Sequence, residues 1–156
     1  MSRTICFIGL GAMGIPMARR LIENQFRVQG FDLNPKALEA HAAQGGIACS
    51  TATEAAKGAE ALILMVVNAN QARAALVASG ALEALNKDAL VILMATCAPT
   101  DAKEIAGMVE KAGRRFLDAP VSGGVVGAEA GTLTIMAGGS AALFEAAKPY
   151  LSALGD

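Results

Sequence analysis

This sequence has few of the residues that build metal centres, disulfide frameworks and aromatic cores. Its 156 residues include three cysteines, one histidine, five phenylalanines, one tyrosine and no tryptophan. Cys6, Cys49 and Cys97 are widely spaced and lie in or beside apolar stretches, which argues against disulfide pairing and against a zinc site. We therefore expect no bound metal, and we interpret Cys6 and Cys49 as small buried hydrophobic residues.

Excess charge and long apolar runs are also missing. The chain carries 13 basic and 14 acidic residues, so its charge gives no reason to expect nucleic acid or an anionic membrane as a partner. The longest apolar runs, 61–67 and 89–95, are far shorter than the ~20 residues of a membrane-spanning helix. Residues 1–10 do not resemble a signal peptide. We expect a cytoplasmic protein.

The lone histidine, His41, falls in a predicted helix within "PKALEAHAAQ". Neither a second metal ligand nor a carboxylate partner lies at helical spacing from it. We therefore interpret His41 as an ordinary histidine on a helix surface.

Apolar residues, by contrast, make up 54% of the chain, enough for one domain with a real core. Short apolar runs alternate with helix-patterned ones, and near-continuous apolar strands are typical of a parallel sheet covered on both faces. We predict an α/β fold over residues 1–156, with a doubly wound, mostly parallel sheet of the Rossmann type. The predicted strands are 4–8, 27–31, 61–66, 89–94, 116–118 and 133–137. The predicted helices are 12–24, 35–43, 51–57, 69–84, 99–113 and 140–152, and 123–131 is expected to be a loop with one helical turn.

Capping residues support these boundaries. Pro35 and Pro99 stand where a helix can begin without losing a hydrogen bond. Asn34 is a candidate N-cap for the helix at 35–43, and Ser50 or Thr51 for the helix at 51–57.

A glycine pattern marks the first turn from strand to helix. The residues are Gly9, Leu10, Gly11, Ala12, Met13 and Gly14, which fit G-x-G-x-x-G directly after a predicted strand and directly before a predicted helix. Gly9 would allow a tight turn, Gly11 a close approach of the backbone to a pyrophosphate, and Gly14 close packing of the helix on the sheet. The N-terminus of that helix would then face the phosphates. The alternative is a tight turn with chance glycines.

Asp32 indicates which dinucleotide binds. It ends the second predicted strand, close to the spacing of about 20 residues expected for an acid that binds the ribose hydroxyls. A carboxylate there would repel a 2′-phosphate. Neither of the next two residues, Leu33 and Asn34, is an arginine, and Lys36 is the only nearby cation. We therefore predict NAD, with NADP disfavoured; the alternative for Asp32 is a capping or turn aspartate.

A second glycine cluster lies in "DAPVSGG". A predicted strand ends at Asp118, Pro120 stiffens the exit, and residues Ser122, Gly123 and Gly124 supply a hydroxyl and unobstructed backbone N–H groups. Such a cluster at the carboxyl end of a strand could hold a carboxylate. The alternative is a flexible loop between two strands.

Taken with "FIGLGAMGIPMARRL" and "GTLTIMAGG", these motifs resemble the N-terminal half of the β-hydroxyacid dehydrogenases. That family includes 3-hydroxyisobutyrate, 6-phosphogluconate, tartronate semialdehyde and L-threonate dehydrogenases. The likeness covers essentially the whole chain, and "VVNANQ" with "DAPVSGGVVGAEAGTLTIMAGG" is most similar to the L-threonate-like branch.

The resemblance implies hydride transfer between NAD and a small β-hydroxy acid. It assigns the substrate carboxylate to Ser122, Gly123 and Gly124. It also places Val67 and Asn68 beside the adenosine ribose, and Thr96 beside the nicotinamide ribose. Cys97 then replaces a small neighbour of the cofactor, and we interpret it as a packing substitution without a catalytic role.

The resemblance also implies that this chain holds no catalytic residue. The family's proton-accepting lysine lies on a helix that we expect beyond Asp156, in an all-helical domain that usually forms the dimer. We expect the chain alone to be inactive, and a homo-oligomer to form where that domain is present. Two alternatives stay open, a stand-alone NAD-binding sensor or regulatory module and the N-terminal half of an imine-reductase relative. A sensor would have no use for the Ser-Gly-Gly cluster.

Overall fold

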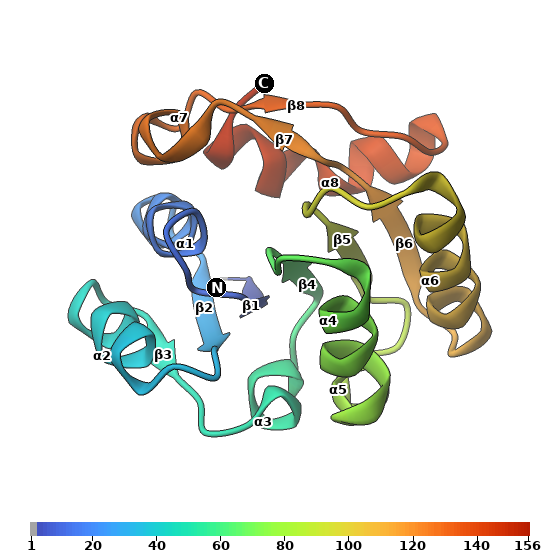
Figure 1. Ribbon diagram of the computed structural model, residues 1–156, viewed down its shortest axis with the longest axis horizontal. Coiled ribbons are helices and arrows are strands. Elements are labelled where there is room, and N and C mark those ends of the chain that lie inside the picture. Colours follow the sequence, from blue (N-terminus) through green and yellow to red (C-terminus); the bar gives the residue numbers. More distant parts are fainter. Residues whose placement is uncertain (1–2) are drawn as a thin grey trace.

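The computed structural model describes residues 3–156, which are built around one six-stranded parallel sheet (Figure 1). The strand order is β3-β2-β1-β4-β5-β6. Their bounds are Thr4–Ile8 for β1, Arg27–Phe31 for β2, Ile47–Ala48 for β3, Ala61–Leu64 for β4, Leu90–Leu93 for β5 and Arg115–Asp118 for β6. The doubly wound fold predicted from the sequence is confirmed. The short strand β3 was missed, because two residues are too few to show a pattern.

The strand order reverses beside β1, which is where this class of sheet binds ligands. The chain starts at β1 in the middle of the sheet, builds β2 and β3 on one side, and then crosses to β4 on the other. Ile8 therefore pairs with Phe31 on one side and with Leu64 on the other. Since all six strands are parallel, the turns after β1, β2 and β4 emerge at the same edge.

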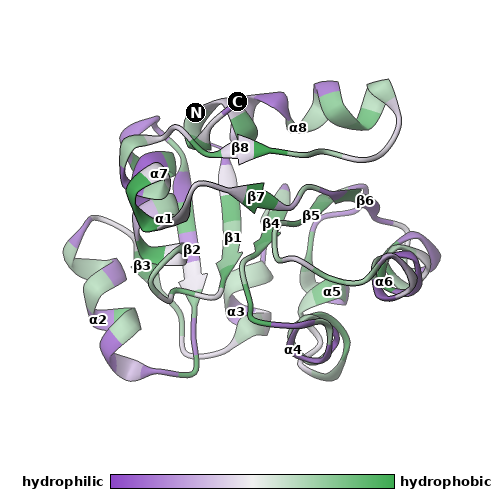
Figure 2. Cartoon of the chain, turned by 45° about the horizontal axis from the view of Figure 1, so that its top comes forward, coloured by the Kyte–Doolittle hydropathy of each residue, from purple (hydrophilic) through white to green (hydrophobic). Residues whose placement is uncertain are grey.

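Helices cover both faces of the sheet. Residues that alternate along β1 separate two cores, with Ile5 and Phe7 on one face and Cys6 and Ile8 on the other. The first face is covered by α1 (Gly14–Glu23), α2 (Pro35–Ala43), α7 (Gly124–Ala130) and α8 (Ala141–Leu154). The second is covered by α3 (Ala52–Ala56), α4 (Ala69–Arg73), the π-helical turn η1 (Ala74–Ala78), α5 (Ala81–Ala84) and α6 (Pro99–Lys111). Figure 2 shows hydrophobic residues along the central strands and hydrophilic ones on α2 and α6.

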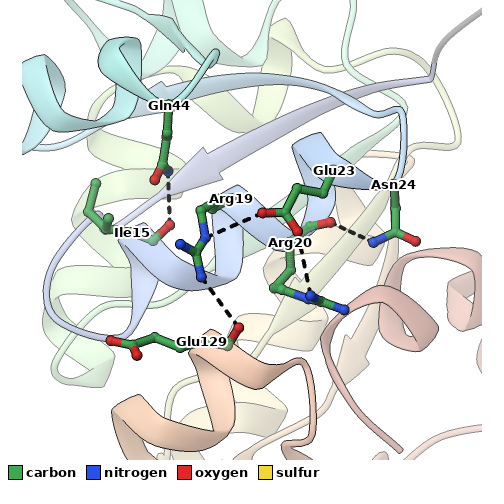
Figure 3. A network of polar contacts seen from close by, with 7 residues as sticks. All are labelled: Ile15, Arg19, Arg20, Glu23, Asn24, Gln44 and Glu129. Atoms are coloured by element: carbon green, nitrogen blue, oxygen red, sulfur yellow. Dashed lines mark hydrogen bonds and ion pairs between the residues drawn. The ribbon is translucent and has the colours of Figure 1, made fainter.

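Helix α1 is tied to its neighbours by polar contacts (Figure 3). The Gln44 side chain donates to the carbonyl of Ile15 at 2.9 Å, near the start of the helix. In the middle of the helix, the Arg19 guanidinium donates to the carbonyl of Glu129 in α7 at 3.4 Å. Arg19 also pairs with Glu23, within α1, at 3.5 Å. The helix that follows the first glycine turn is therefore bonded to Gln44 near its start and to α7 at its middle.

The C-terminal region departs from the predicted pattern. Strand β7 (Val121–Ser122) pairs antiparallel with β8 (Thr134–Ile135) in a separate two-stranded sheet. The strand predicted at 133–137 therefore exists in shortened form but lies outside the parallel sheet. The loop predicted at 123–131 is wrong, because α7 is a helix of seven residues. Its glycines and alanines show no helical periodicity of apolar residues in the sequence. In the structure, Gly127 and Ala128 are nevertheless the buried residues of this helix.

The helix predicted over 69–84 is divided into three parts. It runs as α4, η1 and α5, and Gly80 separates the last two with a φ of 83°. The helix at 35–43 is confirmed with its bounds, and the Asn34 side chain caps it by accepting from the N–H of Lys36 at 3.0 Å. Thr51 caps α3 in the same way, accepting from the N–H of Glu54 at 3.0 Å.

The interpretation of His41 as a surface residue is wrong. Its side chain is fully buried, and Nε2 lies 3.0 Å from the carbonyl oxygen of Val28. Burial lowers the pKa of His41, so the ring is held neutral and Nε2–H donates to that carbonyl. The ring fits because Gly30 and Gly46 leave room for it, since a Cβ on either glycine would collide with the ring. No local sequence pattern indicates that a helix side chain will fit into space left by glycines in another segment.

The predicted burial of two cysteines is confirmed. Cys6 and Cys49 are buried, whereas Cys97 is partly exposed. Burial raises the pKa of both buried thiols, which keeps them protonated and unreactive. Among residues 3–156, no helix combines the length and the apolar character needed to cross a membrane.

Candidate cofactor site

A cavity of about 670 Å³ opens where the strand order reverses. It is walled by the ends of β1, β2 and β4 and by the helices on the second face of the sheet. Its lining comes from segments 8–9, 31–33, 50–52 and 65–67, with Gly11, Gln71, Ala74, Ala75 and Ser79. Its size is that of a small-molecule site.

Two of the three motif glycines are explained by the packing of the protein itself. Gly9 has a φ of 102°, and a Cβ there would collide with the carbonyl of Met65. A Cβ on Gly14 would collide with the carbonyl of Gly9, so α1 can approach the turn only because Gly14 lacks a side chain. These contacts match the turn and packing roles predicted for both residues.

Gly11 has no such internal explanation. Its φ lies outside the left-handed region, and a Cβ there would have no protein atom within 4 Å. It is exposed and lines the cavity. The space that a side chain would fill is therefore open to a ligand, which fits a pyrophosphate lying against the backbone at the N-terminus of α1.

Asp32 stands beside this turn at the end of β2. Its Oδ2 accepts from the N–H of Leu10 at 2.7 Å, and its Oδ1 accepts from the N–H of Asn34 at 2.8 Å. These bonds fix the carboxylate on the cavity wall and use about half of its four acceptor positions. The other half can accept from the two hydroxyls of a ribose.

The turn after β4 supplies a further polar group that the sequence prediction missed. The Gln71 Oε1 accepts from the N–H of Val67 at 2.9 Å, while the N–H of Gln71 donates to the Asn68 Oδ1 at 2.9 Å. Because a backbone donor occupies Oε1, the Gln71 amide nitrogen keeps two hydrogens for other partners. Val67 and Gln71 line the cavity, whereas Asn68 caps α4 outside the lining. The spacing N-x-x-Q is a capping signal that could have identified Gln71.

Another part of the cavity lining was also missed. It includes Leu33, whose side chain is 91% exposed, together with Ser50 and Thr51. Ala74 and Ala75 of the π-helical turn complete it with small side chains. The pair "ST" before a helix predicted a cap, but only the crossover from β3 to β4 places it across the cavity.

The other predicted site residues do not line this cavity. Leu10 is buried beneath the turn, Ala12 and Met13 form the turn before α1, and Gly14 is the first residue of that helix. Thr96 is exposed in the connection from β5 to α6, so it emerges at the same edge of the sheet.

The second glycine cluster follows β6. Ser122 ends β7, and Gly123 and Gly124 have φ values of 133° and 61°. All three residues are exposed, and none of them lines the cavity.

Two titratable groups with shifted pKa values lie at the end of β6 and after the neighbouring strand β5. Burial raises the pKa of Asp118, at the end of β6. Burial, and next the charge of Asp118, raise the pKa of the Cys97 thiol. A thiol that stays protonated is a poor nucleophile, which agrees with a packing role for Cys97.

Comparison with known proteins agrees with this geometry. A family model described as the NAD binding domain of 6-phosphogluconate dehydrogenase matches residues 4–156. The NAD-dependent L-serine dehydrogenase of Pseudomonas aeruginosa is 40% identical over 154 residues, covering 98% of this chain and 52% of that protein. The L-threonate dehydrogenase of Cupriavidus necator is 39% identical over 155 residues, with 99% and 52% covered.

A solved structure agrees as well. The 3-hydroxyisobutyrate dehydrogenase of Mycobacterium tuberculosis, solved with L-serine, superposes with a TM-score of 0.95 at 38% identity. The match covers 99% of this chain and 53% of that one. The chain thus spans about half the length of the relatives that it matches.

Proposed function

Because this chain belongs to the family of NAD-binding domains of 6-phosphogluconate dehydrogenase, its cofactor is NAD, and we propose that it serves an oxidoreductase acting on a small β-hydroxy acid. The bound nicotinamide would supply the hydride acceptor. The chain's own residues would bind the cofactor, orient it and hold the carboxylate of the acid. We propose that residues 1–156 act together as this cofactor domain.

The observation that carries the proposal is the placement of Asp32. Its carboxylate is fixed on the cavity wall by the N–H groups of Leu10 and Asn34. The bond to Leu10 links Asp32 to the glycine turn, so the groups proposed to bind ribose and pyrophosphate are held as one unit. An acceptor for hydroxyls beside an open backbone surface at Gly11 is what an adenine dinucleotide requires.

The remaining roles follow the order of the strands. The backbone of residues 9–14 and the start of α1 would hold the pyrophosphate. Val67, Asn68 and Gln71 follow β4 and would flank the adenosine ribose, while Thr96 follows β5 and would approach the nicotinamide ribose. The segment 122–124 comes after β6, the last strand in the order of the parallel sheet.

The hydroxy-acid class rests on Ser122, Gly123 and Gly124. The N–H groups of Gly123 and Gly124 and the Ser122 hydroxyl could hold a carboxylate with little side-chain help. Candidate acids are L-threonate, 3-hydroxyisobutyrate and L-serine, the substrates in the names of relatives. This cluster favours an enzyme over a sensor that only binds NAD.

Cofactor selectivity tests the proposal most directly. We expect calorimetric titration to show tighter binding of NAD than of NADP. Asp32→Ala should weaken the binding of NAD by about 1.5–3 kcal/mol, which is the contribution of hydrogen bonds to a charged group. The difference in affinity between NAD and NADP should therefore become smaller. Asp88→Asn is the control, because Asp88 precedes β5 at the opposite edge of the sheet. Equal affinities in the unmutated chain would contradict the proposal.

The substrate class needs its own measurement. Each candidate acid is titrated into the NADH-saturated chain while the nicotinamide fluorescence is followed. We expect a saturable change that Ser122→Ala weakens and Ser152→Ala, an exposed position on α8, leaves unchanged. A response that is equal in both variants would remove Ser122 from the site.

A further inference from the structure

A network of hydrogen bonds occupies the cavity wall formed by Ser50 and Thr51. The N–H and the hydroxyl of Ser50 both donate to Oε2 of Glu54, at 3.2 Å and 2.7 Å. The Thr51 Oγ1 accepts from the N–H of Glu54 at 3.0 Å. The wall is thus held to the carboxylate of Glu54 through both donors of Ser50.

Backbone donors beside Asp32 are also occupied. Asp32 accepts from the N–H groups of Leu10 and Asn34. The N–H of Lys36 donates to the Asn34 side chain at 3.0 Å. The Lys36 ammonium is exposed on the first turn of α2, where water screens its charge.

Two of the groups that line the cavity can only accept hydrogen bonds. Asp32 keeps about half of its acceptor positions, and the Ser50 hydroxyl, having given its hydrogen to Glu54, can only accept. A ribose with free hydroxyls brings donors that match these groups. A 2′-phosphate brings only acceptors and between one and two negative charges at neutral pH, so it would be repelled by the carboxylate of Asp32 and by that of Glu54, which is bonded to the cavity-lining Ser50.

We propose that Glu54 is a specificity-determining residue that disfavours NADP, acting together with Asp32. This inference rests on the proposed function, because it concerns the same cavity. Glu54 contributes in two ways. It takes up the donors of Ser50, which lines the cavity, and it places a negative charge 2.7 Å from the Ser50 hydroxyl.

The test compares NADPH and NADH affinities of the unmutated chain with those of Glu54→Gln. Glutamine keeps an acceptor for Ser50, so the cap of α3 is preserved, while the charge is lost and an amide donor is gained. We expect NADPH to bind about 3- to 10-fold more tightly, the effect of removing one partly screened like charge. The affinity for NADH should change less than about twofold, because a ribose hydroxyl carries no charge that Glu54 could repel.

Two further arms separate this role from a structural one. Glu145→Gln removes the same charge from α8, on the opposite face of the sheet, and should leave both affinities unchanged. The gain of Glu54→Gln should also shrink when the ionic strength is raised from about 0.02 M to about 0.5 M, since the Debye length then falls several-fold.

The outcomes distinguish the two proposals. Failure of the unmutated chain to bind NADH would overturn the proposed function. Normal NADH binding with no selective gain for NADPH in Glu54→Gln would overturn the role of Glu54 alone. An equal loss of both cofactors in a folded Glu54→Gln, judged by circular dichroism, would also overturn it, because Glu54 would then only support the wall.

Discussion

The chain has two glycine-rich turns after strands, and they differ in what requires the glycine. In the first, Gly9 and Gly14 are required by contacts within the parallel sheet, whereas Gly11 meets no protein atom. In the second, Gly123 and Gly124 are required by their positive φ values. The second turn belongs to the small antiparallel sheet and lies outside the cavity.

The difference separates glycines that serve the fold from a glycine that serves a ligand. A glycine is needed for the fold where a Cβ would collide or where the backbone is left-handed. Gly11 meets neither condition, so we propose that its lack of a side chain serves a ligand that approaches the backbone. The substitutions below test this distinction.

The largest effect is expected from Gly14→Ala. The added Cβ would collide with the backbone carbonyl of Gly9, which cannot move without displacing the turn from Met65. We expect a loss of about 3 kcal/mol in the free energy of unfolding, at the upper end of overpacking effects. Urea denaturation measures it. A stability within about 0.5 kcal/mol of the unmutated chain would show that α1 does not depend on this contact.

Gly11→Val should leave the stability unchanged and weaken NAD binding instead. The new side chain would project into open space, so stability should change by less than about 0.5 kcal/mol, as for most surface substitutions. NAD affinity should fall about 100-fold, because the side chain would occupy the place of the pyrophosphate and overpacking of this kind costs up to about 3 kcal/mol. Calorimetry and circular dichroism are measured on the same sample. Normal NAD binding by the folded variant would place the phosphates elsewhere.

Acid should lower the free energy of unfolding through the buried His41. Its folded-state pKa is lowered by burial, so the unfolded chain takes up the proton first as the pH falls. Stability is therefore complete above about pH 6.5 and declines below it, by up to about 1.4 kcal/mol per pH unit. Urea denaturation at pH 7.5 and pH 5.5 should show this loss, and His41→Gln should show a smaller one. Equal losses in both proteins would exclude His41 as the cause.

The smallest effect on NAD binding is expected from Gly124→Ala in the second turn. Gly124 has a φ of 61°, and a Cβ would find nothing within 4 Å. The cost is therefore that of left-handed backbone alone, about 1–2 kcal/mol at most. NAD affinity should be unchanged, since Gly124 does not line the cavity. A parallel loss of NAD affinity would show that the two turns are coupled, in contrast to the separation described above.

The parallel core was predictable from the sequence because its signals are local. The strands at 4–8 and 27–31 were predicted with their observed bounds, since short runs that contain β-branched and aromatic residues can be recognised without their partners. The glycine motif likewise placed the first turn, and four of the predicted residues, Gly9, Gly11, Asp32 and Val67, line one cavity. The roles of the predicted site residues stay predictions.

The regions that were mispredicted depend on contacts between distant segments. Helix α7 is formed from glycines and alanines that have no period of their own, and it packs beside α1. His41 is buried because two glycines from β2 and the turn before β3 leave space for its ring.

The sequence by itself determined the order of strands and helices, the two glycine turns and the acid at the end of β2, because propensity, capping and periodicity act over a few residues. Only the tertiary structure decided which of these groups meet. The bond from Leu10 to Asp32 joins residues 22 positions apart, and the wall of Ser50 and Thr51 reaches the cavity through the crossover from β3 to β4. Such contacts follow from the packing of whole elements, which no local pattern encodes.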